Sequence, residues 1–278
     1  MSTPRDTKQT GACEFAKKRL LAISGDPLVF ADWGQVVFLH FLVPAERLRP
    51  DVPAPFELEL YEGSACVSLV ALTMRRFRPC RSISPAWLLA PVVRQRFLNL
   101  RTYVRCQGEP GALFLHGWLS KPLPIPLPSG RFELPYSFAS LDYAHELETG
   151  MLKGVVSRNG GDGQFAYCAP ITPNAPFQPC VPGSLAEFAL ERYAGFFCRH
   201  QQAYVFRAWH PAWLQTPIEP CIEDSLVRVR FPWLDGAKLA GGNFAPGFER
   251  VWLGRAHRID EADKARRSHR LSAFYKMP

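Results

Sequence analysis

The chain has 278 residues, of which 47% are hydrophobic and 13% aromatic, enough to bury the core of one large domain. Its 26 prolines and 20 glycines favour many turns and short strands over long helices. The formal net charge of +8 is concentrated in residues 1–20 and 256–278, and no zinc-finger, helix-turn-helix or RNA-binding motif accompanies it, so we expect no specific nucleic-acid partner.

Cysteine and histidine spacing argues against metal and disulfide sites. No two of the eight cysteines are separated by only two residues, and the seven histidines do not fall at metal-ligand spacing. Neither a nucleotide-binding glycine motif nor a Gly-x-Ser-x-Gly elbow is present. There is no apolar signal segment and no run of about 18 apolar residues. We therefore expect a cytoplasmic protein with free thiols, no metal, no cofactor and no membrane contact.

The N-terminal part of the chain begins with a polar stretch. Residues 1–13 are predicted to be frayed, and a short helix is predicted over residues 14–23. Residues 33–43 are almost wholly apolar and predict a strand that is buried on both faces. His40 lies in this strand, where a lone histidine is either a hydrogen-bonded core residue or a catalyst. A single helical turn is predicted at residues 44–48.

Two further strands are predicted over residues 56–60 and 65–74, the first alternating and the second mainly apolar. Residues 75–97 then form a segment rich in arginine, proline and large apolar groups. Such a segment either lines a site or makes a subunit contact, and the sequence supports both interpretations.

The stretch over residues 98–143 contains the site that we predict. In residues 98–106 apolar side chains alternate with polar ones, among them Asn99 and Arg101, which is the period of a half-buried strand. A Gly-Glu-Pro-Gly turn joins this strand to a second one over residues 112–119. The polar face is either a solvated surface or the wall of a site.

A proline-rich segment follows the predicted hairpin. Four prolines between residues 122 and 128 exclude a helix and indicate an extended arm or an edge strand. We expect this arm to bring Arg131 and Tyr136 to the hairpin.

Alternating sequence between turn residues predicts further antiparallel strands along the rest of the chain. They are a hairpin over residues 138–158 and strands at 165–170, 203–209, 226–231 and 248–253, with a glycine-rich turn at 160–163. The clearest helix begins at Ser184, because Glu187 completes a capping box, and its inward side is predicted to consist of Leu185, Phe188, Ala189, Tyr193 and Phe196. We expect this helix to plug the sheet or pack against it.

Polar residues in otherwise apolar segments are the candidates for a site. They are His40, Asn99, Arg101, Tyr103, Arg131, Tyr136, Arg158 and His210. A buried arginine needs an anionic partner, which is either a carboxylate of the protein or one of a ligand. His210 begins a His-Pro-Ala-Trp run that is either a packed turn or part of the site.

A series of ordered segments resembles the YqjF-like family of uncharacterised proteins. The segments are FLHFLVPAERLRPDVPAPFELELYEGSACVSLVAL, NLRTYV, PGALFL, R-x-x-LPY, SLAEFALERY, HPAWL and F-x-P-G-F-x-x-VW, spanning about residues 33–253. This family is similar to acetoacetate decarboxylase. The resemblance implies a mainly β (α+β) fold, an antiparallel cone-shaped β-barrel with a central cavity and a few decorating helices, commonly assembled as a homo-oligomer. We place the barrel domain at residues 25–255, after a flexible segment 1–24 and before a basic tail 256–278.

The chain departs from the decarboxylase at the catalytic position. Acetoacetate decarboxylase uses a lysine Schiff base, and the resemblance aligns Tyr136 with that lysine. Leu42 similarly stands where the decarboxylase has an arginine for the substrate carboxylate. A tyrosine cannot form an imine, so we expect no acetoacetate decarboxylation.

We therefore predict that a small organic ligand with a carboxylate binds in the barrel cavity. Tyr136 and His40 are the candidate acid or base. The candidate ligand-binding residues are Asn99, Arg101, Arg131, Arg158 and His210. Two alternatives stay open: an enzyme of the lyase or hydrolase type that acts on an oxo acid or related carbonyl compound by acid/base chemistry, and a structural or partner-binding protein.

Overall fold

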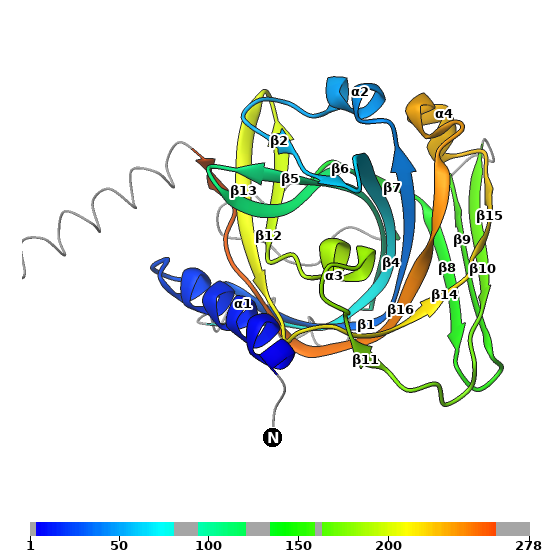
Figure 1. Ribbon diagram of the computed structural model, residues 1–278, viewed down its shortest axis with the longest axis horizontal. Coiled ribbons are helices and arrows are strands. Elements are labelled where there is room, and N and C mark those ends of the chain that lie inside the picture. The colour runs from blue at the N-terminus through cyan, green and yellow to red at the C-terminus, as the bar shows by residue number, and fades with distance from the viewer. Residues whose placement is uncertain (1–3, 81–93, 121–133, 159–162, 260–278) are drawn as a thin grey trace, which may run out of the picture.

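The computed structural model describes residues 4–80, 94–120, 134–158 and 163–259. Its longest strands pair edge to edge into a ring (Figure 1). In order around the ring they are β16 (Lys238–Leu253), β1 (Val29–Val43), β4 (Ser64–Pro79), β5 (Gln95–Cys106), β6 (Glu109–Leu119), β12 (Ala194–Arg199) and β13 (Gln202–Trp209). Pairing of β13 with β16 closes the ring, and neighbouring strands are antiparallel except β6 and β12. The mainly antiparallel β fold predicted from the sequence is confirmed.

Short strands pair with the long strands of the ring or with one another. They are β2 (Glu57–Leu58) beside β5, β3 (Leu60–Tyr61) beside β4, β7 (Tyr136–Phe138) beside β6, β14 (Leu214–Ile218) beside β16, β11 (Gln178–Pro179) beside β14, and β17 (His257–Arg258) beside β13. Among these, β7 runs parallel to β6, which brings Tyr136 against the wall of the ring.

A second, four-stranded sheet packs on the outside of the ring, at the right of Figure 1. Its strands, in order, are β15 (Cys221–Asp224), β10 (Gln164–Pro170), β9 (Met151–Ser157) and β8 (Ser140–Glu146). Every second residue of β8, β9 and β10 is buried, and Leu141 and Val156 share one apolar core with Leu98 and Leu100 of β5. The outward face of β5 is therefore covered by protein, and the predicted hairpin over residues 138–158 is confirmed.

The helices are short except the first. They are α1 (Pro4–Leu21), α2 (Ala45–Leu48) with a 3₁₀ turn at Arg49–Asp51, α3 (Leu185–Leu190), and α4 (Val227–Arg230) with a 3₁₀ turn at Pro232–Leu234. In the view of Figure 1, α3 lies within the ring and α1 lies beside it. Within the described residues, no helix has both the length and the apolar character needed to cross a membrane. All eight cysteines are free thiols, as predicted.

Helix α3 begins as the capping box predicted. The Ser184 hydroxyl accepts a hydrogen bond from the Glu187 N–H at 3.2 Å, and the Glu187 carboxylate accepts one from the Gly183 N–H at 2.6 Å. The helix ends at Leu190, so the prediction that its inward side continues to Tyr193 and Phe196 is wrong; Phe196 lies in β12. Buried Ala189 and Leu190 pack into the apolar cluster on the inner side of the ring.

Helix α1 begins at Pro4, so the prediction of frayed residues up to position 13 is corrected, and most of the segment predicted to be flexible is helical. Contacts distant in the sequence hold this helix. The Cys13 thiol donates to the His210 carbonyl at 3.2 Å, and the Trp209 indole N–H donates to the Cys13 carbonyl at 3.2 Å. A prediction from the polar composition of residues 1–13 cannot show these long-range hydrogen bonds.

The predicted strand over residues 226–231 is wrong, because this segment forms α4 and the start of a 3₁₀ turn. The Asp224 carboxylate accepts hydrogen bonds from the N–H groups of Leu226, Val227 and Arg228, at 3.0, 2.7 and 3.2 Å. The first N–H groups of a helix have no partner within the helix, and the Asp224 carboxylate provides one. This cap therefore stabilises a helix here rather than a strand. Of the alternating valines, Val227 is buried, whereas Val229 is 79% exposed.

Two other boundaries differ from the prediction. The turn between β5 and β6 consists of Gln107 and Gly108, with φ of 50° and 77°, rather than residues 108–111. These angles are typical of a two-residue type I′ hairpin. Strand β16 begins at Lys238, well before the predicted strand at residues 248–253.

Candidate functional site

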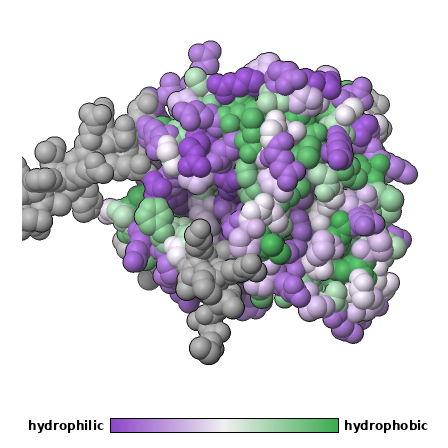
Figure 2. All heavy atoms as spheres, viewed as in Figure 1, coloured by the Kyte–Doolittle hydropathy of each residue, from purple (hydrophilic) through white to green (hydrophobic). Residues whose placement is uncertain are grey.

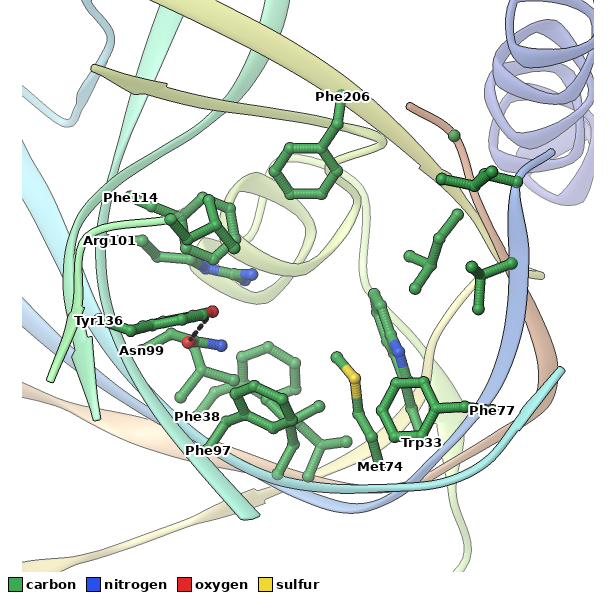
Figure 3. Close-up of a pocket in the computed structure, with 18 of the residues that line it drawn as sticks. Trp33, Phe38, Met74, Phe77, Phe97, Asn99, Arg101, Phe114, Tyr136 and Phe206 are labelled. Carbon is green, nitrogen blue, oxygen red and sulfur yellow. Dashed lines mark hydrogen bonds between the residues drawn. The ribbon is translucent and has the colours of Figure 1, made fainter. Parts of the chain in front are cut away.

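A cavity of about 110 Å³ lies on the inner side of the ring (Figure 3). Among the described residues, most side chains that line it are apolar or aromatic. The polar groups of the lining are the side chains of Asn99 and Arg101, the Tyr136 hydroxyl and the indole N–H groups of Trp33 and Trp213. A concave, mostly apolar site with a few convergent polar groups is the usual form of a small-molecule site. The outer surface in the same view is different, with hydrophilic and hydrophobic residues interspersed (Figure 2).

The alternation of β5 places Asn99 and Arg101 on the inner side of the ring. Their neighbours Leu98 and Leu100 point outward into the core beneath the second sheet. Across the ring wall, Asn99 is paired with Val70 and Arg101 with Ser68, both on β4. The polar face predicted from the sequence therefore lines a cavity and is not a solvated surface.

Tyr136 reaches the cavity from β7, where it is paired with Gly117 of β6. Its ring covers Gly117 so closely that a Cβ atom there would lie 1.9 Å from the Tyr136 Cε1 atom. The Tyr136 hydroxyl donates a hydrogen bond to Asn99 Oδ1 at 2.7 Å. Burial raises the pKa of Tyr136 above its ordinary value, so this hydroxyl keeps its proton at neutral pH.

Arg101 is a cation in this apolar cavity. Its Nη2 donates to the carbonyl of Ala189, at the end of α3, at 2.9 Å, and its guanidinium carbon lies 5.4 Å from the centre of the Phe38 ring. Its Nε has no hydrogen-bond partner, and no ion pair joins Arg101 to an acidic side chain of the described chain. Arg101 is half-buried, and a partly desolvated cation without a carboxylate is stabilised when an anion arrives from elsewhere.

Other arginines show the alternative that the sequence left open, which is pairing with a carboxylate of the protein. Arg207 binds both carboxylate oxygens of Glu109, at 3.2 and 2.7 Å. Arg192 pairs with Glu59. Arg101 differs from both, because its guanidinium faces the cavity without such a partner in the described residues.

His40 lies next to the cavity but is not part of its lining. Its Nε2 lies 3.0 Å from Asn243 Oδ1, and its Nδ1 lies 2.7 Å from the Ser68 hydroxyl, which lies 2.6 Å from the Tyr103 hydroxyl. The Asn243 amide in turn donates to Gln215 at 2.6 Å, which fixes its carbonyl toward His40 and places the imidazole proton on Nε2. Burial lowers the pKa of His40 to about 4, and the Arg101 charge lowers it further. His40 is a neutral, fully hydrogen-bonded core residue.

His210 forms a packed turn beneath the cavity wall. Its Nδ1 lies 2.7 Å from the Pro211 carbonyl, and its ring stacks on Tyr193 and Phe248 at 4.8 and 5.0 Å. Burial lowers the pKa of His210 to about 4. Trp213, at the end of the same run, lines the cavity, whereas His210 does not.

Arg158 is not brought to the cavity. It lines a separate cleft of about 430 Å³ together with His116, Trp118 and Arg230. His116 and Trp118 are paired with Leu100 and Leu98, whose side chains point away from the inner side of the ring. Arg131 and the predicted proline arm lie outside the described residues. The structure thus brings together Asn99, Arg101 and Tyr136 from the predicted set.

The family of the chain follows from comparison with known proteins. The model of the DUF2071 family, described as an uncharacterised conserved protein, matches residues 31–240. The chain belongs to this family. The uncharacterised protein YqjF of Bacillus subtilis (strain 168) is 28% identical to this DUF2071 chain over 202 residues, which are 72% of the chain and 80% of YqjF. The predicted YqjF-like membership is confirmed.

Solved structures share the fold of the DUF2071 chain. An acetoacetate decarboxylase-like enzyme from Sphingomonas wittichii RW1 superposes with a TM-score of 0.59 at 14% identity, covering 84% of this chain and 94% of that one. The enduracididine biosynthesis enzyme MppR complexed with pyruvate gives a TM-score of 0.56 at 14% identity, covering 83% and 90%. At these identities the likeness establishes the acetoacetate decarboxylase-like fold.

The aromatic and aliphatic half of the cavity was not predicted as part of the site. Trp33, Phe38 and Met74 line it, yet in the sequence they are only apolar residues of buried strands. Apolar residues that line a cavity and those that fill a core have the same alternation, so periodicity does not separate them. A sequence feature that points to the lining is the spacing of Phe38 and His40. They lie two residues apart, so the side chain of Phe38 is on the same face of β1 as the candidate His40.

Proposed function

We propose that this DUF2071 protein binds a small organic carboxylate in the cavity, with the Arg101 guanidinium as the group that holds the anion. The observation that carries the proposal is an arginine facing an apolar cavity without an acidic partner in the described residues. Arginine binds carboxylates by charge-assisted hydrogen bonds, which are stronger than neutral ones and strengthen further where water is excluded.

The polar groups next to Arg101 are suited to bind either the ligand carboxylate or a carbonyl group adjacent to that carboxylate. Asn99 Oδ1 is occupied by the Tyr136 hydroxyl, so the amide nitrogen of Asn99 is turned toward the cavity (Figure 3). An amide N–H is a neutral donor that adds a hydrogen bond to an anion held by a guanidinium. MppR, which shares the fold, is described in complex with pyruvate, a small oxo acid.

No lysine is among the described residues that line the cavity, so none of these residues could form a Schiff base with a ligand. Tyr136, which the resemblance aligns with the catalytic lysine, lines the cavity and cannot form an imine.

A second candidate function is proton transfer to an oxo acid by Tyr136. The favouring observation is that its protonated hydroxyl lines the same cavity as Arg101. With a raised pKa this hydroxyl would act as a hydrogen-bond or proton donor rather than as a base. Turnover of an oxo acid that Tyr136→Phe abolishes while binding is retained would support an enzyme; turnover unchanged in Tyr136→Phe would exclude this role.

The proposal is tested by thermal unfolding with small oxo and hydroxy acids. A ligand present at 100 times its Kd should add about 2.7 kcal/mol to the free energy of unfolding. We expect this shift to vanish in Arg101→Gln and to persist in Arg105→Gln. Arg105 is a matched control, because it lies on the same strand but pairs with Glu59 and is 43% exposed. Equal shifts in both variants would contradict the proposal. The cytoplasmic location and homo-oligomeric state stay predictions.

A further inference from the structure

The cavity has two chemically different ends (Figure 3). Asn99, Arg101 and Tyr136 project from one side, where β5 and β7 lie. Trp33 and Met74 project from the opposite side, from β1 and β4. A ligand that satisfies both ends must carry an anion at one end and an apolar group at the other.

We infer that the cavity is built for a carboxylate bearing one compact aromatic ring, an arylalkanoate, rather than for the small oxo acids that a likeness to a pyruvate-binding structure would suggest. This inference rests on the proposed function, in that it assigns the anion to Arg101. What it adds is the chemical class of the group that occupies the other end.

The cavity volume limits the size of that group. An apolar cavity of about 150 Å³ stays dry and binds benzene, whereas drug-sized ligands occupy about 300–1,000 Å³. At about 110 Å³ the cavity is closer in size to a site for a single ring than to a site for a drug-sized ligand. Acetate or pyruvate would fill the polar end and leave the apolar end without contacts.

The lining favours an aromatic ring over another apolar group of the same size. Phe38 meets Trp213 edge to face with ring centres 5.2 Å apart, and Trp213 stacks on Trp33 at 6.3 Å. On the polar side, the rings of Phe97 and Tyr136 lie 5.8 Å apart. Aromatic walls at these separations offer faces and edges to a further ring, beyond the effect of apolar burial.

Isothermal titration calorimetry with phenylacetate, acetate, pyruvate and benzyl alcohol tests the inference. We expect phenylacetate to bind at least about 30-fold more tightly than acetate or pyruvate, because burial of one ring contributes that much affinity. Benzyl alcohol, which keeps the ring and lacks the charge, should bind far more weakly than phenylacetate.

Variants at the apolar end make the test specific. Met74→Trp fills this end, so it should reduce phenylacetate affinity to the level of acetate without changing acetate binding. Val155→Trp adds a tryptophan at an exposed position of β9, outside the cavity lining, and is the matched control, with little expected effect. Thermal unfolding of each variant establishes that it is folded.

The outcomes separate the inference from the proposed function. If pyruvate binds as tightly as phenylacetate and Arg101→Gln abolishes both, the carboxylate site stands and the aromatic inference is overturned. If benzyl alcohol binds as tightly as phenylacetate and Arg101→Gln changes neither, the anion site itself is overturned. If no probe binds at millimolar concentration, both are overturned.

Discussion

Arg101 is the residue whose surroundings most need an explanation. In the described chain it has a backbone carbonyl as a partner but no carboxylate, while its Nε has no hydrogen-bond partner. A protein selected for stability alone has no need of such a charge, since an apolar side chain of similar volume is often neutral or stabilising at a buried ionic position.

This reasoning gives a prediction for the unliganded protein. Arg101→Met should leave the free energy of unfolding within about 1 kcal/mol of the wild type, or raise it, because no paired charge is left behind. Arg207→Met removes a buried partner of Glu109 and should cost at least about 2 kcal/mol. Urea denaturation of the two variants measures this. A larger loss in Arg101→Met than in Arg207→Met would show that Arg101 has a mainly structural role.

His40 is a single residue that makes the free energy of unfolding depend on pH. Its pKa is about 4 in the folded protein and about 6.5 in an unfolded chain. As pH falls from 6.5 toward 4, the unfolded chain takes up a proton that the folded protein does not, so the free energy of unfolding falls, by up to about 3 kcal/mol for this residue. Above pH 6.5 the contribution is constant.

His40→Gln should therefore flatten the decline of stability between pH 6.5 and 4. The decline should not disappear, because burial also lowers the pKa of His116, His145 and His210 to about 4. Urea denaturation at pH 7, 5.5 and 4.5 measures the difference between the two slopes. Parallel curves for the variant and the wild type would mean that His40 is already protonated in the folded state.

The sequence identifies candidate residues at this scale better than it identifies their partners. Asn99, Arg101 and Tyr136 stand out as polar groups in apolar strands, and the structure brings them together. Arg158 gave the same signal, yet it lines a different cleft. Alternation shows that a strand has two faces, but in a ring with protein on both sides it does not show which face is the inner one.

At the scale of elements, the position of β7 depends on Gly117. The Tyr136 ring occupies the space that any side chain at position 117 would need, so β6 and β7 can lie side by side only with glycine there. This close approach is one use of glycine within a strand.

Gly117→Ala should displace Tyr136, cost about 1–3 kcal/mol of stability by overpacking and weaken carboxylate binding. The matched control is Gly11→Ala, since Gly11 lies in α1 and a Cβ there would meet nothing within 4 Å. In a helix that control should be neutral or stabilising by up to about 1 kcal/mol. Thermal unfolding and calorimetry measure both variants. Unchanged stability and binding in Gly117→Ala would contradict the packing described.

Helix α4 depends on the Asp224 cap. Asp224→Ala removes the acceptor of three backbone N–H groups and should cost about 1–2 kcal/mol. Glu223→Ala, at an exposed neighbouring position of the same strand, should change stability by less than about 0.5 kcal/mol. Chemical denaturation compares the two, and equal losses would argue against the cap.

The same element shows why part of the secondary structure was mispredicted. Val227 and Val229 alternate with arginines as in a strand, but Asp224 three residues before Val227 is also a helix-start signal. Where two local patterns conflict, long-range contacts decide. Here Val227 joins the apolar core, which the sequence does not reveal.

At the scale of the whole molecule, the defining feature is the closure of the ring by β13 and β16. This contact involves Ala208 and Leu253, which are far apart in the chain, and no local pattern specifies it. The strands themselves were predictable from alternation and turns. Their arrangement followed only from the resemblance to a known family, which the family match and the shared fold confirm.

Closure of the ring also forms the wall of the cavity. The second sheet covers the outer face of β5, and α3 packs against the inner face. Polar groups that would be solvated on an open sheet are therefore held in an apolar space, where an anion bound to Arg101 gains more than it would in water.

The most direct test is calorimetric titration of phenylacetate into the wild type, Arg101→Gln and Arg105→Gln. The structure predicts binding by the wild type and Arg105→Gln, and a loss of at least about 30-fold in affinity for Arg101→Gln, since a charge-assisted hydrogen-bond pair contributes on the order of 2 kcal/mol or more. Equal affinity in all three proteins would contradict a carboxylate site at Arg101.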